Sequence, residues 1–305
     1  MRDPLPVQPG TERWIDVDGV RAHAVEWGDP DREQRILLVH GLGASTLSWE
    51  PVGGRLATAL DATVTAVDLP GFGLTRIPAG RRATVGASGR LVAALLAELG
   101  PAVVFGNSMG GAIGVGLAAR HPDLVRALGL VDPALPQRGV RLPPWQLVTR
   151  MAPLMVPQIG GRVLGMRARR LGPAGMVDTT LEWSVAHPER VDPALRERLV
   201  ALATERSTFP EVPTAYADAA RSLFFYFQRG MPADLGRVKC PTLIVHGVLD
   251  RLVPVSSARA VAARHPEFAL EVIDDCGHAP QLELPDRFLE LVTPWLTALP
   301  AAVRE

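Results

Sequence analysis

Three separated positions in the chain carry the side chains of a nucleophile, a base and an acid. Ser108 is the centre of a G-x-S-x-G pattern that it forms with Gly106 and Gly110, between an apolar segment and a segment of small residues. A serine on a sharp strand-to-helix turn exposes its hydroxyl above the sheet, and flanking glycines leave room for the turn. The pattern therefore predicts that Ser108 is a nucleophile.

A serine hydroxyl is a weak nucleophile and needs a base. His278 follows the apolar run 268–273, and a neutral imidazole suits proton transfer near pH 7. Asp250 follows the apolar run 242–246 and can hold the imidazole in the required tautomer. The order serine, aspartate, histidine is the one found with this kind of serine turn. We therefore predict that Ser108, Asp250 and His278 are catalytic.

The glycine-containing turn after residues 35–40 predicts a second part of the site. Gly41 allows the backbone N–H of Leu42 to face a ligand, and paired with the N–H of Met109 it would form an oxyanion hole. Such a donor contributes about 3 kcal/mol to transition-state stabilisation. Asn107 is the only asparagine in the chain, which suggests a role for its amide, with helix capping or a turn as the alternative. Gly41 and Asn107 are thus possible substrate-binding residues.

Short β-branched segments alternate with longer helical patterns along most of the chain. This alternation predicts an α/β fold, a mostly parallel sheet with helices on both faces. Asp18-Gly19 predicts a hairpin near the start. The expected strands are 14–17, 22–26, 35–40, 64–68, 102–105, 124–131, 242–246 and 268–273, and the expected helices are 49–60, 91–99, 109–120, 256–265 and a last one ending near 299.

The alternation stops in the middle of the chain. From Ala134 to about Gly236 there is no clean strand, and apolar residues recur at helical spacing between prolines. A helical insert of this kind would cover the carboxyl edge of the sheet, where open α/β sheets bind ligands. We therefore expect three parts: 1–133 as the first part of the core, 134–236 as a helical cap or lid, and 237–305 as the second part of the core.

The bulk composition is that of a globular protein. The 305 residues are 47% hydrophobic and 21% charged, and the formal net charge is +0, so no overall field attracts nucleic acid or an anionic membrane. Residues 1–10 contain no apolar secretory signal, which predicts a cytoplasmic protein without stable membrane insertion. The histidines show no metal-ligand spacing, so we expect no metal. Four arginines of the cap form either a solvated helix face or a clamp for a substrate carboxylate: Arg162, Arg167, Arg169 and Arg170.

Five motifs follow expected strands: 40–43, 68–73, 106–111, the Asp250 loop and 277–278. In this order they resemble those of the α/β-hydrolase superfamily, in its esterase- and lipase-like branch with a serine nucleophile. The resemblance implies an eight-stranded sheet, a cap after the sixth strand, and no metal or organic cofactor. Some members place the acid where this chain has Asp132, before Pro133. The loop of Asp250 matches the pattern of the superfamily more fully, so we predict Asp250 as the acid.

A serine at the position of the nucleophile argues against two activities of this superfamily, epoxide hydrolysis and dehalogenation. Epoxide hydrolases and haloalkane dehalogenases of this superfamily carry aspartate where this chain has Ser108. We expect hydrolysis of a small-molecule carboxylic ester with an apolar acyl or alcohol part, through an acyl-enzyme. C–C bond hydrolases of aromatic ring-fission products usually carry tryptophan after the histidine, where this chain has Ala279. That activity, acyl transfer, lactone opening and a non-catalytic ligand-binding role remain alternatives, and the oligomeric state is not indicated.

Overall fold

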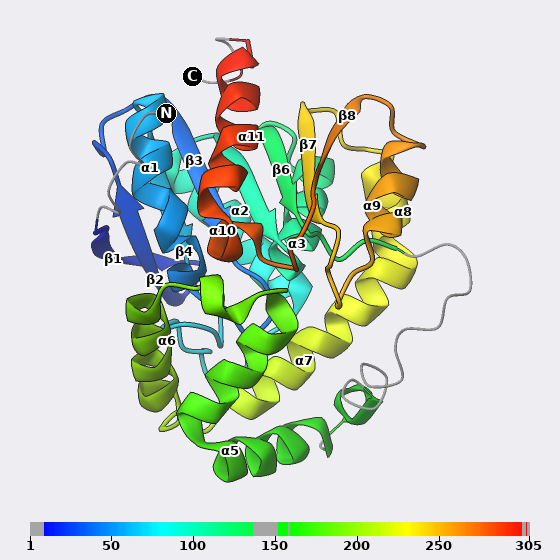
Figure 1. Ribbon diagram of the computed structural model, residues 1–305. Coiled ribbons are helices and arrows are strands. Elements are labelled where there is room, and N and C mark those ends of the chain that lie inside the picture. Colours follow the sequence, from blue (N-terminus) through cyan, green and yellow to red (C-terminus); the bar gives the residue numbers. More distant parts are fainter. Residues whose placement is uncertain (1–8, 137–151, 158, 301–302, 304–305) are drawn as a thin grey trace.

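Eight strands form one sheet in the order β1-β2-β4-β3-β5-β6-β7-β8. The computed structural model describes residues 9–136, 152–157, 159–300 and 303. The strands β3 to β8 are mutually parallel, and β2 pairs antiparallel with both β1 and β4, so the predicted mostly parallel eight-stranded sheet is confirmed (Figure 1). The strands are β1 (Thr11–Val17), β2 (Val20–Trp27), β3 (Arg35–Val39), β4 (Thr63–Val67), β5 (Ala102–Asn107), β6 (Val125–Val131), β7 (Thr242–Gly247) and β8 (Phe268–Ile273).

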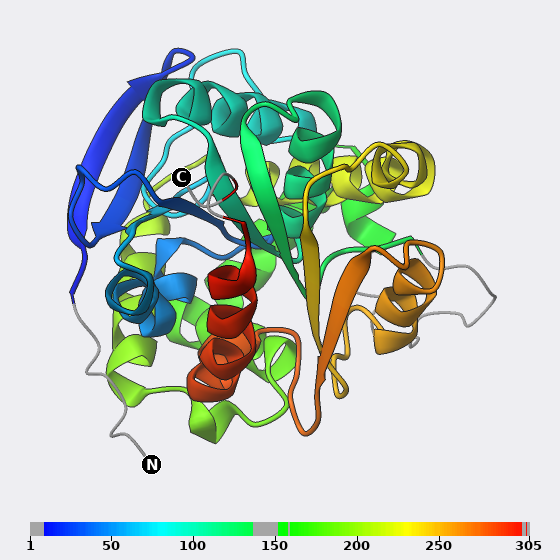
Figure 2. The same cartoon turned by 90° about the horizontal axis from the view of Figure 1, so that it is seen from above.

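Alternating side chains of the strands build two apolar layers, one on each face of the sheet. In β3, Leu37 and Val39 join the cluster under α2 (Val85–Leu99), α3 (Met109–Arg120) and α9 (Val255–Ala262). Ile36 and Leu38 join the opposite cluster under α1 (Glu50–Leu60) and α11 (Pro285–Ala298). Successive residues of a strand point to opposite faces, so a strand buried on both faces reads as a continuous apolar run. Figure 2 shows α1 and the red α11 on one side of the sheet, with α2 and α3 on the other.

One predicted helix begins earlier than its apolar pattern indicated. The expected segment 91–99 is the second part of α2, which starts at Val85. Thr84 ends the preceding loop in extended conformation, and its hydroxyl accepts a hydrogen bond from the Ala87 amide at 3.1 Å. An N-cap of this type satisfies a free amide and fixes the first residue of a helix.

Between β6 and β7 the described residues form helices and turns. In Figure 1, α5, α6 and α7 lie together below the sheet, across one end of its strands. Gly172, with φ 66°, and Pro173 break α5 into two parts. No helix of the described residues is long and apolar enough to span a membrane. The division at 134 and 236 stays a prediction, and the first eight residues and 137–151 lie outside the described part. The helices are α5 (Ile159–Ser184), η2 (Pro188–Arg190), α6 (Pro193–Arg206), α7 (Val212–Phe225), η3 (Tyr226–Gly230) and α8 (Met231–Leu235).

Candidate active site

Ser108 occupies a strained turn between β5 and α3. Its backbone has φ 53° and ψ −111°, a left-handed conformation that residues with a side chain rarely adopt. Holding such a conformation costs on the order of 1–3 kcal/mol, and the surrounding structure must impose it. A Cβ at Gly106 would lie 2.3 Å from the Gly110 carbonyl, and one at Gly110 would lie 2.2 Å from the Val39 oxygen. The two glycines of the motif are therefore required by close backbone contacts.

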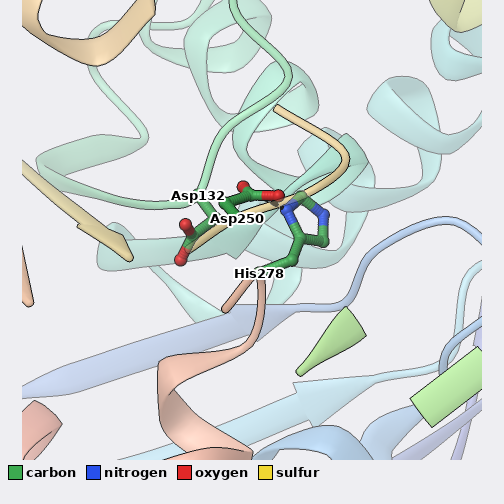
Figure 3. Close-up of side chains that lie close together, drawn as sticks. All are labelled: Asp132, Asp250 and His278. Carbon is green, nitrogen blue, oxygen red and sulfur yellow. Dashed lines mark hydrogen bonds and ion pairs between the residues drawn. The ribbon is translucent and has the colours of Figure 1, made fainter. Parts of the chain in front are cut away.

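His278 and Asp250 meet at the carboxyl edge of the sheet. The Nδ1 atom of His278 lies 2.7 Å from Oδ2 of Asp250, and both residues are buried. The other oxygen of Asp250 accepts hydrogen bonds from the Leu252 and Val253 amides. Burial alone would raise the pKa of Asp250, but the two imidazoles of His278 and His246 outweigh it and lower the pKa well below its ordinary value. Asp250 is thus ionised and holds the His278 ring (Figure 3).

The two predicted oxyanion-hole amides are those of Leu42, which follows β3 and lines the same cavity as Ser108, and of Met109, the first residue of α3. Neither the Leu42 nor the Met109 amide donates a hydrogen bond to a described backbone acceptor. The loop of Leu42 is fixed by His40, whose Nδ1 donates to the Gly41 carbonyl at 2.7 Å and whose Nε2 accepts from the Leu69 amide at 3.0 Å. Burial lowers the pKa of His40, which keeps the ring neutral for this double role.

Ser108, Leu42 and His278 open onto one cavity of about 1490 Å³ between the sheet and the helices above it. The Ser108 hydroxyl makes no hydrogen bond with His278 or another described residue; catalytic contacts of this kind are often long without substrate. Of the four cap arginines, Arg169 lines this cavity. The cavity wall is mostly apolar and includes Leu135, Met155, Met176, Val177, Leu181, Leu199, Tyr216, Leu223, Phe224, Phe227 and Leu282.

Comparison with known proteins shows the family. A model of the alpha/beta hydrolase family matches residues 36–291. The chain belongs to this family. It is 31% identical over 247 residues to the pimeloyl-[acyl-carrier protein] methyl ester esterase of Chromobacterium violaceum, covering 81% of this chain and 88% of that protein.

Two further relatives show how broad the alpha/beta hydrolase family is. The chain is 26% identical over 265 residues to the 2-hydroxymuconate semialdehyde hydrolase of Pseudomonas putida, covering 85% of this chain and 86% of that protein. A crystal structure of a membrane phospholipase A, described as a bacterial virulence factor, has a TM-score of 0.73 at 26% identity, covering 97% of this chain and 87% of that one. The predicted family and fold are confirmed, whereas the roles of individual residues stay predictions.

The structure shows which groups the side chain of Asn107 contacts, which the sequence alone did not indicate. Its amide nitrogen donates to the carbonyl oxygens of Val131, at 3.1 Å, and His278, at 3.0 Å. The residue before Ser108 therefore ties the serine turn to β6 and to the histidine loop. This contact positions the loops, and the predicted contacts of Asn107 and Gly41 with substrate stay predictions.

A second carboxyl group, Asp132, lies beside the pair. Its side-chain oxygen accepts from the Gly247 amide at 2.9 Å and lies 3.5 Å from Nε2 of His246. Oxygen atoms of Asp132 and Asp250 and a nitrogen of His278 all lie within 4.8 Å of one another (Figure 3). Burial raises the pKa of Asp132 well above its ordinary value, and the charge on Asp250 raises it further. Asp250, and not Asp132, makes the 2.7 Å contact with the base.

The same cluster has the donor types of a metal site. However, Asp250 Oδ2 and His278 Nδ1 are already joined by a hydrogen bond, so a cation would have to break that contact to bind both. The predicted absence of a metal stays a prediction.

Two buried residues of this region were not singled out from the sequence. His246, directly at the end of β7, contacts the Val253 carbonyl at 2.9 Å and Asp250 at 3.4 Å. Glu283 accepts hydrogen bonds from the Gly277 amide at 2.7 Å and from the Ala186 and His187 amides at 3.0 and 2.9 Å. In the sequence, only their closeness to the predicted catalytic residues Asp250 and His278 could have indicated a role for His246 and Glu283. Glu283 joins the histidine loop to the helices above the sheet.

Proposed function

We propose that this alpha/beta hydrolase is a serine esterase that cleaves a carboxylic ester with an apolar acyl or alcohol part. The observation that carries the proposal is the convergence of three groups on one mostly apolar cavity. These groups are the strained Ser108, the hydrogen-bonded pair of His278 and Asp250, and the amides of Leu42 and Met109.

In this mechanism Oγ of Ser108 attacks the ester carbonyl carbon while its proton passes to Nε2 of His278. The amides of Leu42 and Met109 hold the oxyanion of the tetrahedral intermediate. The intermediate collapses, and the leaving alcohol takes the proton from His278. Water then attacks the acyl-enzyme with His278 as base, which releases the carboxylic acid and restores the serine. Asp250 stays ionised throughout and stabilises the imidazolium.

The names of the relatives support an ester as the substrate class. One relative is named as a methyl ester esterase and a structural relative as a phospholipase, while another is named as a semialdehyde hydrolase. The position after the base holds Ala279, a small buried residue packed with Leu181 and Val185. C–C bond hydrolases usually have tryptophan at this position, so the ester is the better supported substrate.

The test is turnover of short-chain nitrophenyl esters by the wild type and by Ser108→Ala. We expect the variant to lose activity while its thermal unfolding is unchanged, because alanine keeps the Cβ of serine and the same backbone conformation. Ser256→Ala, at an exposed serine of α9, is the matched control and should keep full activity. A fluorophosphonate probe should label the wild type and not Ser108→Ala. Unchanged turnover in Ser108→Ala would refute the proposal.

A substrate panel distinguishes the related activities. It should contain an ester series of increasing acyl length, a lactone, an acyl acceptor other than water, and a ring-fission product. Preference for the esters, rising with acyl length, is the expected result because the cavity wall is apolar. Tight retention of a ligand without turnover would instead indicate a binding protein.

A further inference from the structure

The first part of α5 presents an outer face on which apolar and basic side chains alternate. Ile159 and Met166 are 47% and 56% exposed, and Arg162 and Arg170 are exposed as well. Their spacing of three, four and four residues places all four on the same side of a helix. We call this the arginine face. Leu164, on the opposite side, packs against the small cluster of Leu154 and Ala217.

The charge on this face is not balanced by neighbouring acids. Residues 159–171 contain four arginines, and no Asp or Glu occurs in the sequence between Asp132 and Asp178. Within the described residues, neither arginine of the face pairs with a carboxylate. In contrast, Arg196 and Arg198 of α6 pair with Asp178 and Glu50. A protein of net charge +0 thus carries a local positive patch.

The arginine face lies on the outside of the cavity wall. Figure 1 shows the first part of α5 at the edge of the molecule farthest from the sheet. On its inner side, Gly165, Ala168 and Gly172 line the cavity that contains Ser108. The helix therefore stands between the solvent and the cavity, with large apolar side chains turned outward.

We propose that the arginine face docks on the surface of an anionic phospholipid bilayer. Exposed apolar side chains among arginines are the pattern of helices that lie in a membrane interface, with guanidinium groups at the phosphates and apolar groups below them. On the arginine face the exposed Arg162 lies between Ile159 and Met166, so the face lacks the contiguous apolar core typical of a protein interface. A bilayer offers phosphates to the arginines and, just below them, an apolar layer to Ile159 and Met166. An acidic protein surface would offer partners to the arginines alone.

This inference rests on the proposed esterase function and specifies its substrate class. Docking by the outer face of α5 brings the mostly apolar cavity next to the lipid, so the substrate is an ester drawn from the bilayer.

The test measures binding of the full chain to vesicles of phosphatidylcholine alone and of phosphatidylcholine with phosphatidylglycerol. We expect binding to the anionic vesicles that weakens with added salt, and little binding to the neutral ones. Arg162→Gln with Arg170→Gln should weaken it about tenfold or more. Ile159→Gln with Met166→Gln should weaken it as well. The control pair Arg259→Gln with Arg264→Gln, at exposed positions in α9 and just after it, changes the charge equally and should bind like the wild type.

Activity on two substrates separates this inference from the esterase proposal. Both docking variants should hydrolyse a water-soluble nitrophenyl ester at the wild-type rate and a lipid ester in anionic vesicles several-fold more slowly. No vesicle binding, or equal weakening by the control pair, overturns the docking surface and leaves the esterase intact. Binding to polyglutamate as tight as to anionic vesicles, and unaffected by Ile159→Gln with Met166→Gln, also overturns it in favour of an acidic protein. Vesicle binding without any ester turnover refutes the esterase instead.

Discussion

The side-chain amide of Asn107 donates a hydrogen bond to the backbone carbonyl of His278, a residue 171 positions later in the chain. The same nitrogen donates to the Val131 carbonyl, so one side chain ties the serine turn to two neighbouring loops. Because the proposed nucleophile and base come from different loops, their relative position depends on such ties.

Asn107→Ala should therefore reduce kcat more than it changes KM. A misplacement of about 1 Å between reacting groups can cost on the order of 100-fold in rate, and we expect a loss of roughly 10- to 100-fold. Thr63→Val is the matched control, because the buried Thr63 hydroxyl also donates to a backbone carbonyl, that of Asp29, at the opposite end of the parallel strands. It should lower the Tm similarly and leave kcat unchanged. Equal losses of kcat in the two variants would contradict a positioning role.

Glu283→Gln tests the tie between the histidine loop and the helices above the sheet. The two carboxylate oxygens of Glu283 accept from three backbone amides, those of Gly277, Ala186 and His187. An amide side chain offers one oxygen in place of two, and an unsatisfied buried donor costs about 1–3 kcal/mol. We expect a Tm several degrees lower and a reduced kcat. Glu290→Gln, at an exposed ion pair of α11, should change neither; a similar Tm loss in it would show that charge alone is responsible.

Much of the sheet could be predicted because its signal is local. Buried parallel strands read as apolar runs, such as Ile36 to Val39, and the carboxyl ends of parallel strands share one edge. That edge is where Ser108, Asp250 and His278 lie, which the order of the motifs predicted. The start of α2 was missed because residues 85–90 lack an apolar pattern, and the Thr84 cap defines it instead.

The contacts around the site could not be predicted, because they depend on residues distant in sequence. Glu283 meets Ala186 and His187 across separations of 97 and 96 residues. The role of Asn107 likewise depends on the carbonyl of His278. Nothing in the local sequence indicates that Asp132 and His246 are fully buried beside Asp250. Such contacts follow from the packing of the loops and not from their composition.

Low pH should loosen the contact between α7 and the loop before α2. Asp218 of α7 receives two hydrogen bonds from Arg82, at 2.8 and 2.7 Å, and this contact lowers the pKa of Asp218. The hydrogen bond from Arg76 lowers the pKa of Glu211 in the same way. A carboxyl group whose folded pKa is lowered stabilises the fold above its ordinary pKa of about 4, and this stabilisation is lost as the pH falls through the folded value.

Hydrogen exchange of the α7 amides measures this effect. Exchange should be slow at neutral pH and, after correction for the intrinsic rate, faster below pH 4. Arg82→Gln should show the faster opening already at neutral pH. Arg13→Gln, which removes a surface pair with Glu26 on the first hairpin, should behave like the wild type. Opening of α7 that is independent of pH in the wild type would contradict the role of these pairs.

The two buried aspartates should respond differently to the same substitution. Asp250 holds Nδ1 of His278 and its pKa is lowered, so Asp250→Asn removes a needed charge and offers the wrong hydrogen-bond pattern. Loss of the corresponding carboxylate in a serine protease reduces kcat by about 10⁴-fold, and we expect a loss of that order. Burial and the charge of Asp250 raise the pKa of Asp132, which favours its neutral form, so Asp132→Asn removes less charge than Asp250→Asn does. Its kcat should stay within a few-fold of the wild type.

The stability of these variants against pH provides the second half of this test. For an acid whose folded pKa is raised, the stabilisation is present below the ordinary pKa and is lost as the pH rises through the folded value. The wild type should therefore lose Tm as the pH rises above the ordinary pKa of about 4, and Asp132→Asn should lose less, because its amide does not titrate. The measurements are kcat and Tm of both variants from acidic to alkaline pH. A collapse of kcat in Asp132→Asn, with activity kept in Asp250→Asn, would make Asp132 the acid that holds His278.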